Sequence, residues 1–143
     1  MNTYSLCFLL LLNSVHTVKY YNILQVADKK IHQMLIEPLF MYGDKLLEDI
    51  HEYNNRVMDL ISDLRKGTQD GIRNSKHLYR KGEPKFLTYR FDAFIVKTKF
   101  GWNEDQLRQF IKLREKTRQI FKYFCQNVES SKILNDKAGK VLF

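Results

Sequence analysis

The sequence predicts an all-α protein, a small helical bundle of four to five amphipathic helices after an N-terminal signal peptide. Apolar residues recur at three- and four-residue steps along most of the 143-residue chain, which is the spacing of one helix face. The composition, 44% hydrophobic and 28% charged, is typical of a single globular domain. Residues that start and stop helices flank several of the periodic segments.

The first 17 residues have the pattern of a secretory signal peptide. They contain an unbroken apolar run, Leu6–Leu12, followed by polar and small residues. Val15 and Thr17 fill the two small-residue positions before a cleavage site, so the mature chain is predicted to start at Val18. The run is shorter than the about 20 apolar residues that a spanning helix needs. The sequence therefore predicts a secreted protein with no transmembrane segment after signal removal.

The remaining residues, 18–143, are predicted to form a single helical domain. They are enough to bury a core without disulfides. Cys7 leaves with the signal peptide, and Cys125 remains as an unpaired thiol. Its helical neighbours are apolar, which favours burial, while an intermolecular disulfide remains the alternative.

The first two helices are predicted from strong periodicity. Apolar residues at helical steps extend from residue 18 to Ile36, and Pro38 interrupts them. From Leu46 to Leu64 the steps alternate between four and three. Asp44 is placed to cap this second helix, and its end is marked by Arg65, Lys66 and Gly67.

The middle of the chain gives a weaker pattern. Residues 68–80 have few apolar positions and are predicted to form a weak helix held by its neighbours. Residues 86–100 fit both a strand-like alternation and one helix face, and Pro84 and Gly101 favour the helix. The sequence leaves strand and helix open for this segment.

The last helix is predicted to begin with a capping box formed by Asn103 and Gln106. Its apolar pattern continues to Val128, and the helix is expected to run to about Leu134. Short connections between the predicted helices favour antiparallel neighbours.

Charge is unevenly distributed along the chain. The formal net charge is +8. Residues 37–63 hold seven acids and two bases, whereas residues 65–122 hold sixteen bases and six acids. The second half is therefore expected to leave a positive surface, although a run of charges can also be only a solvated helix face.

The tripeptide Arg-Lys-Gly occurs twice, at residues 65–67 and 80–82. Two cations in a last helical turn followed by a left-handed glycine form a helix stop signal, so these cations need no ligand. Four further cations are not explained in this way and are candidate binding residues: Arg73, Lys76, Lys85 and Arg90. Their expected partner is an acidic macromolecule, namely a glycan, an anionic membrane surface or an acidic protein.

Two arginines of the last helix are a second candidate site. A projection at about 100° per residue places Arg114 inside the apolar sector and Arg118 at its edge. Each must reach water or meet a carboxylate, for example on the second helix. The functional alternative is an arginine at the mouth of an apolar pocket, where it holds the carboxylate of a fatty-acid-like ligand.

Catalytic and metal-binding patterns are weak. The sequence HEYNN at residues 51–55 lacks the second histidine of a zinc-protease helix. Glu48 and His51 form a single Glu-x-x-His element, which di-iron bundles use twice. We therefore predict a non-enzymatic protein without metal or cofactor. The secretion signal argues against nucleic acid as a partner.

Two functions follow from the sequence. The first is a secreted binding or interaction protein that presents a basic surface to an acidic macromolecule. The alternative is an extracellular carrier of apolar small molecules, such as fatty acids, in a cavity between helices. The oligomeric state is left open.

Overall fold

A computed structural model describes residues 22–37 and 43–134. Within these ranges the regular structure is helical and contains no strand, so the prediction of a small all-α bundle is confirmed. The predicted signal peptide lies outside the described residues. The described chain forms a helix at residues 22–36, followed by α2 (Gly43–Arg65), α3 (Gln69–Lys81), α4 (Lys85–Thr88), α5 (Ala93–Phe100) and α6 (Glu104–Ser130).

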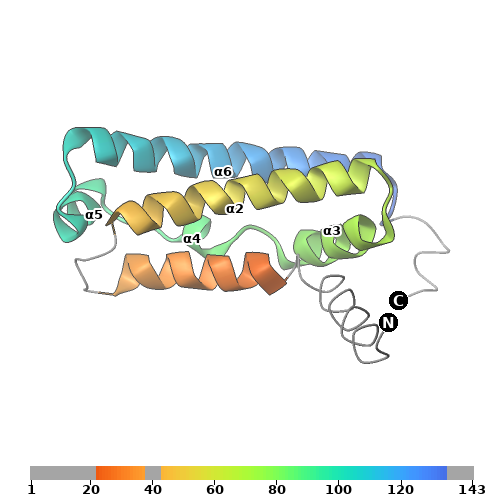
Figure 1. The fold of residues 1–143 in the computed structure, drawn as a ribbon, viewed down its shortest axis with the longest axis horizontal. Helices are drawn as coiled ribbons and strands as arrows, with labels where there is room; N and C mark the ends of the chain where they lie inside the picture. The colour runs from red at the N-terminus through yellow and green to blue at the C-terminus, as the bar shows by residue number, and fades with distance from the viewer. Residues whose placement is uncertain (1–21, 38–42, 135–143) are drawn as a thin grey trace, which may run out of the picture.

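The two longest helices, α2 and α6, lie side by side along the long axis of the molecule (Figure 1). The 22–36 helix and α3 lie beneath them, α5 lies at one end, and α4 lies between the layers (Figure 1). Neighbours in the chain such as α2 and α3 are antiparallel, as expected, but α2 and α6 run parallel to each other. They are parallel because residues 82–103, the crossing segment, return along the bundle before α6 begins.

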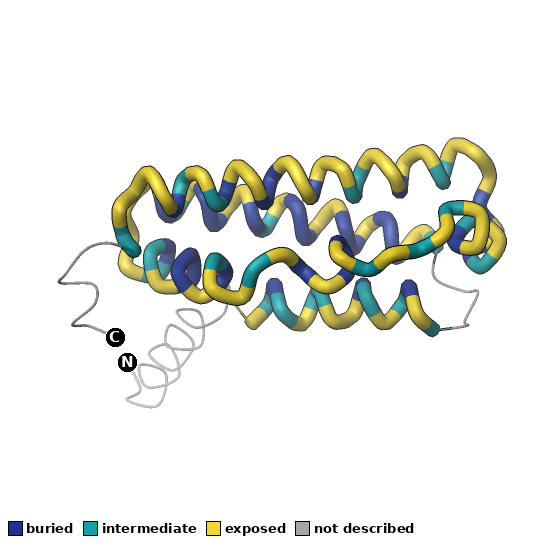
Figure 2. The backbone as a smooth tube through the Cα atoms, turned by 180° about the vertical axis from the view of Figure 1, so that it is seen from behind, coloured by how far each residue is buried: buried dark blue, intermediate teal, exposed yellow. Residues whose placement is uncertain are grey.

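The core lies where α2 faces α6, α3 and the 22–36 helix. The apolar stripe that was predicted on α2 is buried, and Figure 2 shows buried positions on the inner sides of the helices. Aromatic side chains of α6 and of the crossing segment fill the space against it. The largest fully buried rings are Tyr53, Phe86, Phe110 and Phe124.

A polar contact joins α2 to α6 inside this apolar interface. Asn54 and Thr117 are each 1% exposed. The Thr117 hydroxyl donates a hydrogen bond of 2.7 Å to Asn54 Oδ1, and Asn54 Nδ2 donates to the Leu113 carbonyl at 3.3 Å. Buried polar groups are stabilising only when they are paired. This pair therefore favours one register of α2 against α6.

The α2–α3 connection depends on two residues. The Thr68 hydroxyl accepts a hydrogen bond of 3.0 Å from Gly71 N, which caps α3. A Cβ atom on Gly71 would lie 2.6 Å from the carbonyl carbon of Asp63, so only glycine allows the backbones of α2 and α3 to approach this closely. The weak helix predicted here therefore forms because tertiary contacts and a cap support it.

Both Arg-Lys-Gly tripeptides stop a helix, as predicted. The glycines have positive φ, with values of 73° for Gly67 and 84° for Gly82. Gly82 nevertheless differs from the expected left-handed conformation, because its ψ is −166°. The chain is extended at this glycine and proceeds directly toward α4.

Residues 86–100 form two short helices, α4 and α5, joined by an extended stretch at residues 89–92. The prediction of a helix is therefore correct for both ends of this segment and wrong for residues 89–92. The break occurs because Asp92 starts a new helix, where its carboxylate accepts hydrogen bonds from Phe94 N at 2.8 Å and Ile95 N at 3.3 Å. Gly101 ends α5 in a left-handed conformation, as expected.

The predicted ends of α2 and α6 are partly corrected. The capping box of Asn103 and Gln106 is present, but α6 ends at Ser130, and residues 131–134 form turns. Asp44 lies inside the first turn of α2 rather than before it, and its carboxylate accepts a hydrogen bond of 3.1 Å from Gln106 Nε2. This bond connects the beginnings of the two parallel helices.

The 22–36 helix is held to the bundle at three points along its length. Near its beginning, the Asp28 carboxylate contacts the start of α4. Midway, Lys30 forms an ion pair of 3.5 Å with Asp49 of α2. At its end, the Lys99 ammonium donates hydrogen bonds of 2.8 and 2.7 Å to two carbonyls of the last helical turn, those of Met34 and Leu35.

Candidate functional site

The structure distributes the predicted basic residues over several elements. Arg73 is exposed on α3, Lys85 is exposed on α4, and Arg90 is exposed in the extended stretch between α4 and α5. Lys76 differs from the prediction, because it is buried in α3 with 6% exposure and so does not belong to the outer surface. Arg118 is exposed on α6, where it pairs with Glu115 at 2.9 Å.

The densest group of exposed cations lies on α6, and the sequence-based site did not include most of it. Between residues 106 and 128 this helix carries six cations and a single acid, Glu115, while Glu104, Asp105 and Glu129 lie at its two ends. Every one of these cations except Arg114 is exposed. Three of them form no ion pair with another described residue: Lys112, Lys116 and Lys122. The helical projection that placed Arg114 in the apolar sector also places these lysines on the opposite side of the helix.

Arg114 is bound inside the protein. Its guanidinium donates hydrogen bonds of 2.7 Å to the Leu87 carbonyl and 3.0 Å to the Tyr89 carbonyl, at the end of α4. It also lies 4.2 Å from the centre of the Phe91 ring, a distance typical of a cation–π contact. These contacts explain how a charged residue occupies the apolar sector without an ion pair to α2.

The Arg114 side chain remains charged in this environment. Burial, and to a lesser extent the charge of Arg118, lowers the pKa of Arg114 to about 10. Its Nε atom is buried without a hydrogen-bond partner among the described residues. The guanidinium therefore holds the crossing segment against α6. It does not line the groove between the 22–36 helix and the α3–α4 connection.

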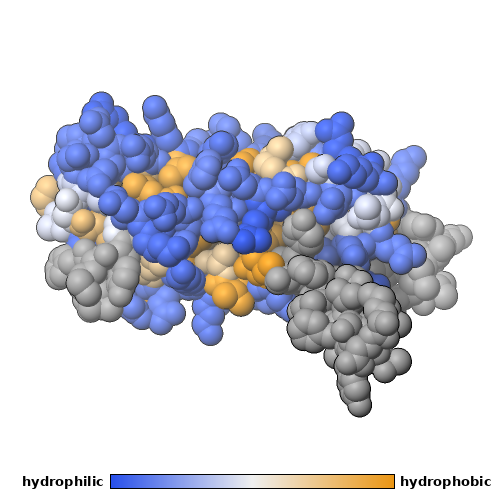
Figure 3. Space-filling model, viewed as in Figure 1, coloured by the Kyte–Doolittle hydropathy of each residue, from blue (hydrophilic) through white to orange (hydrophobic). Residues whose placement is uncertain are grey.

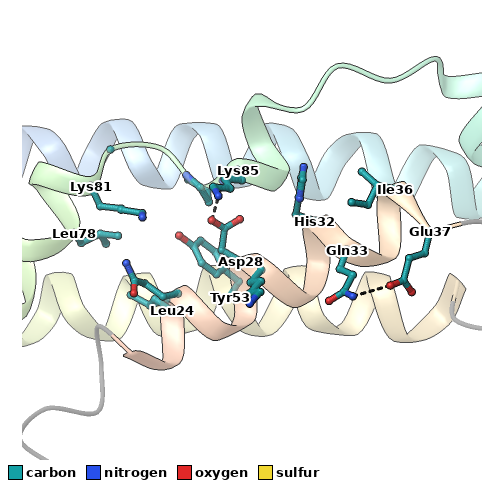
Figure 4. Close-up of a pocket in the computed structure, with 14 residues that line it drawn as sticks. Leu24, Asp28, His32, Gln33, Ile36, Glu37, Tyr53, Leu78, Lys81 and Lys85 are labelled. Carbon is teal, nitrogen blue, oxygen red and sulfur yellow. Dashed lines mark hydrogen bonds between the residues drawn. The ribbon is translucent and has the colours of Figure 1, made fainter.

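A groove of about 480 Å³ lies between the 22–36 helix and the α3–α4 connection. It is open to solvent along one side, and Figure 4 shows the side chains that line it. Leu24, Leu78 and Lys81 lie toward one end, and Ile36 lies toward the other (Figure 4). The buried ring of Tyr53 forms part of its floor.

Asp28 is the main acidic group in the groove, and its carboxylate is already engaged. Its two oxygens accept hydrogen bonds of 2.8 Å from Lys85 N and 3.0 Å from Phe86 N, at the start of α4 (Figure 4). An acidic acceptor at a helix start is favourable because the first backbone N–H groups have no partner within the helix. Asp28 therefore positions α4 along one wall of the groove.

Two rings contribute further polar atoms to the groove. Burial raises the pKa of Tyr53, and the charge of Asp28 adds to this effect, so the hydroxyl stays protonated. The His32 ring packs edge-on against Tyr89 at 5.4 Å between ring centres. The groove thus offers a hydroxyl, an imidazole and lysine side chains around an apolar floor.

Hydrophobic residues are also exposed at isolated positions of the surface. Figure 3 shows a mostly hydrophilic face, with some hydrophobic side chains over the 22–36 helix, where Val26 is 67% exposed. At one end of the molecule Phe94 and Ile95 of α5 are 72% and 64% exposed. Single exposed apolar residues are common on soluble domains.

Cys125 is partly buried and packs against the core. Burial, together with the charges of Glu129 and Glu83, raises the pKa of this thiol to about 11. The thiol is therefore protonated at neutral pH, where the reactive thiolate is scarce. Cys7 lies outside the described residues.

Comparisons of the chain with known proteins find no matching family model, no matching curated protein and no matching solved structure. Within the part of the chain that the structure describes, no helix has the length and apolar composition needed to cross a bilayer. The same part contains no group of three or more side chains placed to hold a metal ion. The chemistry of the α6 surface and of the groove is therefore the basis for a functional assignment.

We expect Arg114→Lys to destabilise the fold by about 1.5–3 kcal/mol, because charge-assisted hydrogen bonds contribute about this much and a lysine cannot keep both bonds and the ring contact. Urea unfolding of the purified protein measures this change. The matched control is Arg118→Lys, which alters an exposed residue and should change stability by less than about 0.5 kcal/mol. Equal effects of the two substitutions would show that Arg114 does not hold the crossing segment.

Proposed function

We propose that the protein is a secreted, non-enzymatic binding protein that presents a basic surface to an acidic macromolecule. The observation that carries the proposal is the cation density of α6, with six cations and one acid between residues 106 and 128. Five of the six cations are exposed. Repulsion between them is relieved when a polyanion binds, and the gain decreases with added salt.

The geometry of α6 fits an extended anionic partner. Lys112 and Lys122 are ten residues apart, which corresponds to about 15 Å along a helix, and Lys116 lies between them. The ion pair of Arg118 with Glu115 joins two side chains that are 50% and 54% exposed. Such exposed pairs are weak, so Arg118 can also turn to a ligand.

Cations outside α6 contribute to the proposed basic surface to a smaller extent. Arg73, Lys85 and Arg90 are exposed on neighbouring elements, and α3 and α4 both contact α6. These three residues are proposed to extend the basic surface. Lys76 is not part of it because it is buried.

Secretion is supported by the composition of residues 1–17, and expression of the full chain in a secreting eukaryotic host tests it directly. We expect the protein in the medium, with Val18 as its first residue by N-terminal sequencing. Protein retained in the cytosol with Met1 still attached would contradict this part of the proposal.

Basic-surface binding is tested by heparin chromatography of the wild type and a Lys112→Gln/Lys116→Gln/Lys122→Gln variant. We expect the wild type to elute above physiological ionic strength, about 0.15 M. The variant should bind about tenfold more weakly, because three exposed charge contacts at roughly 0.5 kcal/mol each are lost.

The control removes the same number of charges from another region, in the variant Lys30→Gln/Lys45→Gln/Arg56→Gln. These three cations already pair with Asp49 and Glu52. We expect the control to elute close to the wild type. Equal shifts in both variants would mean that only net charge matters, and wild-type elution at or below physiological salt would contradict the proposal.

A second function, a carrier of small apolar molecules, is favoured by the groove beside the 22–36 helix. Its volume of about 480 Å³ lies within the range of small-molecule sites, about 300–1,000 Å³. The groove differs from the enclosed cavity that the sequence suggested, because it opens to solvent. A ligand in it would keep part of its surface in water.

A further inference from the structure

The groove between the 22–36 helix and the α3–α4 connection has two chemically different ends (Figure 4). At one end the Lys81 side chain extends into the groove above the buried residues Leu24 and Leu78. At the other end Ile36 is 52% exposed, so an apolar side chain lies partly in water there, beside Gln33 and the carboxylate of Glu37 (Figure 4). An anionic head group is therefore favoured at the Lys81 end and disfavoured at the Ile36 end. A molecule with a polar head and an apolar body matches this polarity.

The Tyr53 hydroxyl points into the groove beside Asp28 (Figure 4). The Tyr53 residue is 2% exposed, and its hydroxyl forms no hydrogen bond with another described residue. The hydroxyl oxygen is not one of the fully enclosed, unpaired polar atoms of the described residues, so it is open to the groove. A protonated hydroxyl in this position can donate a hydrogen bond to water or to an anionic oxygen of a ligand.

Cations outnumber acids in the lining of the groove. Three lysines line the groove, Lys29, Lys81 and Lys85, against the carboxylates of Asp28 and Glu37. Asp28 already accepts two backbone hydrogen bonds, and Glu37 accepts one from Gln33 at 2.7 Å. None of the three lysines forms an ion pair with a described acid. The lining therefore favours an anion over a cation.

We propose that the groove binds an amphipathic organic anion. The acid group lies near Lys81, Lys85 and the Tyr53 hydroxyl, and the apolar body follows the 22–36 helix past His32 to Ile36. This proposal depends on the second function, a carrier of small apolar molecules, and specifies the class of ligand. It is independent of the α6 surface, because α6 does not line the groove.

Titration calorimetry with decanoate tests the proposal, and decylamine provides the same chain with a cationic head. We expect saturable binding of decanoate with one site per chain, and binding of decylamine at least tenfold weaker. Decyl phosphate distinguishes a carboxylate preference from a general anion preference. No saturable binding of either anion, or binding of decylamine as tight as that of the anions, would overturn the proposal.

Substitutions at both ends of the groove test where the ligand lies. We expect Lys81→Gln to weaken decanoate binding about tenfold, which corresponds to about 1.4 kcal/mol for a lost charge-assisted contact. Ile36→Gln should weaken it several-fold by exposing the apolar body. Tyr53→Phe removes only the hydroxyl and should also weaken binding, with a thermal melting curve to confirm that the core is intact.

The matched controls are Lys66→Gln, directly after α2, and Ile111→Gln on α6, which change an exposed lysine and an isoleucine that is 48% exposed. Both should leave decanoate affinity unchanged. Equal losses in the controls and in the groove variants would place the ligand elsewhere and overturn the site. Heparin binding of the groove variants separates the basic-surface proposal from the groove proposal. The groove variants should still bind heparin whether or not decanoate binds to them.

Discussion

The paired side chains of Asn54 and Thr117 determine how the two longest helices lie against each other. Both are almost completely buried, in an interface that is otherwise apolar. A shift of α6 by one turn would take both Thr117 and the Leu113 carbonyl away from Asn54 and leave the buried Asn54 amide unpaired, at a cost of about 1–3 kcal/mol. The Thr117 hydroxyl would keep an acceptor within α6, the Leu113 carbonyl at 2.9 Å. Apolar residues alone would allow several registers of similar stability. The polar pair therefore selects the register in which the apolar stripes of α2 and α6 face each other along their length.

The parallel arrangement of α2 and α6 has consequences for every other element. Residues 82–103 must return along the bundle, and polar contacts hold both ends of α4 in this segment: Asp28 at its start and Arg114 at its end. Each contact satisfies backbone groups that a short helix leaves unpaired. The segment also forms one wall of the groove, so the same residues that complete the fold shape the candidate ligand site. Because α6 turns its apolar side inward, its cations other than Arg114 face solvent.

The sequence predicted the features that depend on local periodicity and caps. The stripe from Leu46 to Leu64 and the capping box at Asn103 were correctly identified because each can be recognised within a few residues. It did not predict the break at residues 89–92, where Asp92 caps a new helix. The Leu87 and Tyr89 carbonyls, where the break begins, accept hydrogen bonds from Arg114, which is distant in the sequence. Lys76 was assigned to the surface because burial of a lysine in a helix with few apolar residues has no local signal. The groove combines Asp28, Tyr53 and Lys81 from three helices, and no spacing in the sequence connects them.

Asn54 and Thr117 couple α2 to α6 in this register, and a double-mutant cycle measures the strength of that coupling. Asn54→Leu, Thr117→Val and the double variant are compared by denaturant unfolding. We expect each single change to destabilise the protein by about 1–3 kcal/mol, and the double change to destabilise it by at least about 1 kcal/mol less than the sum. Additive effects of the two substitutions would contradict a direct contact and, with it, the proposed arrangement of the bundle.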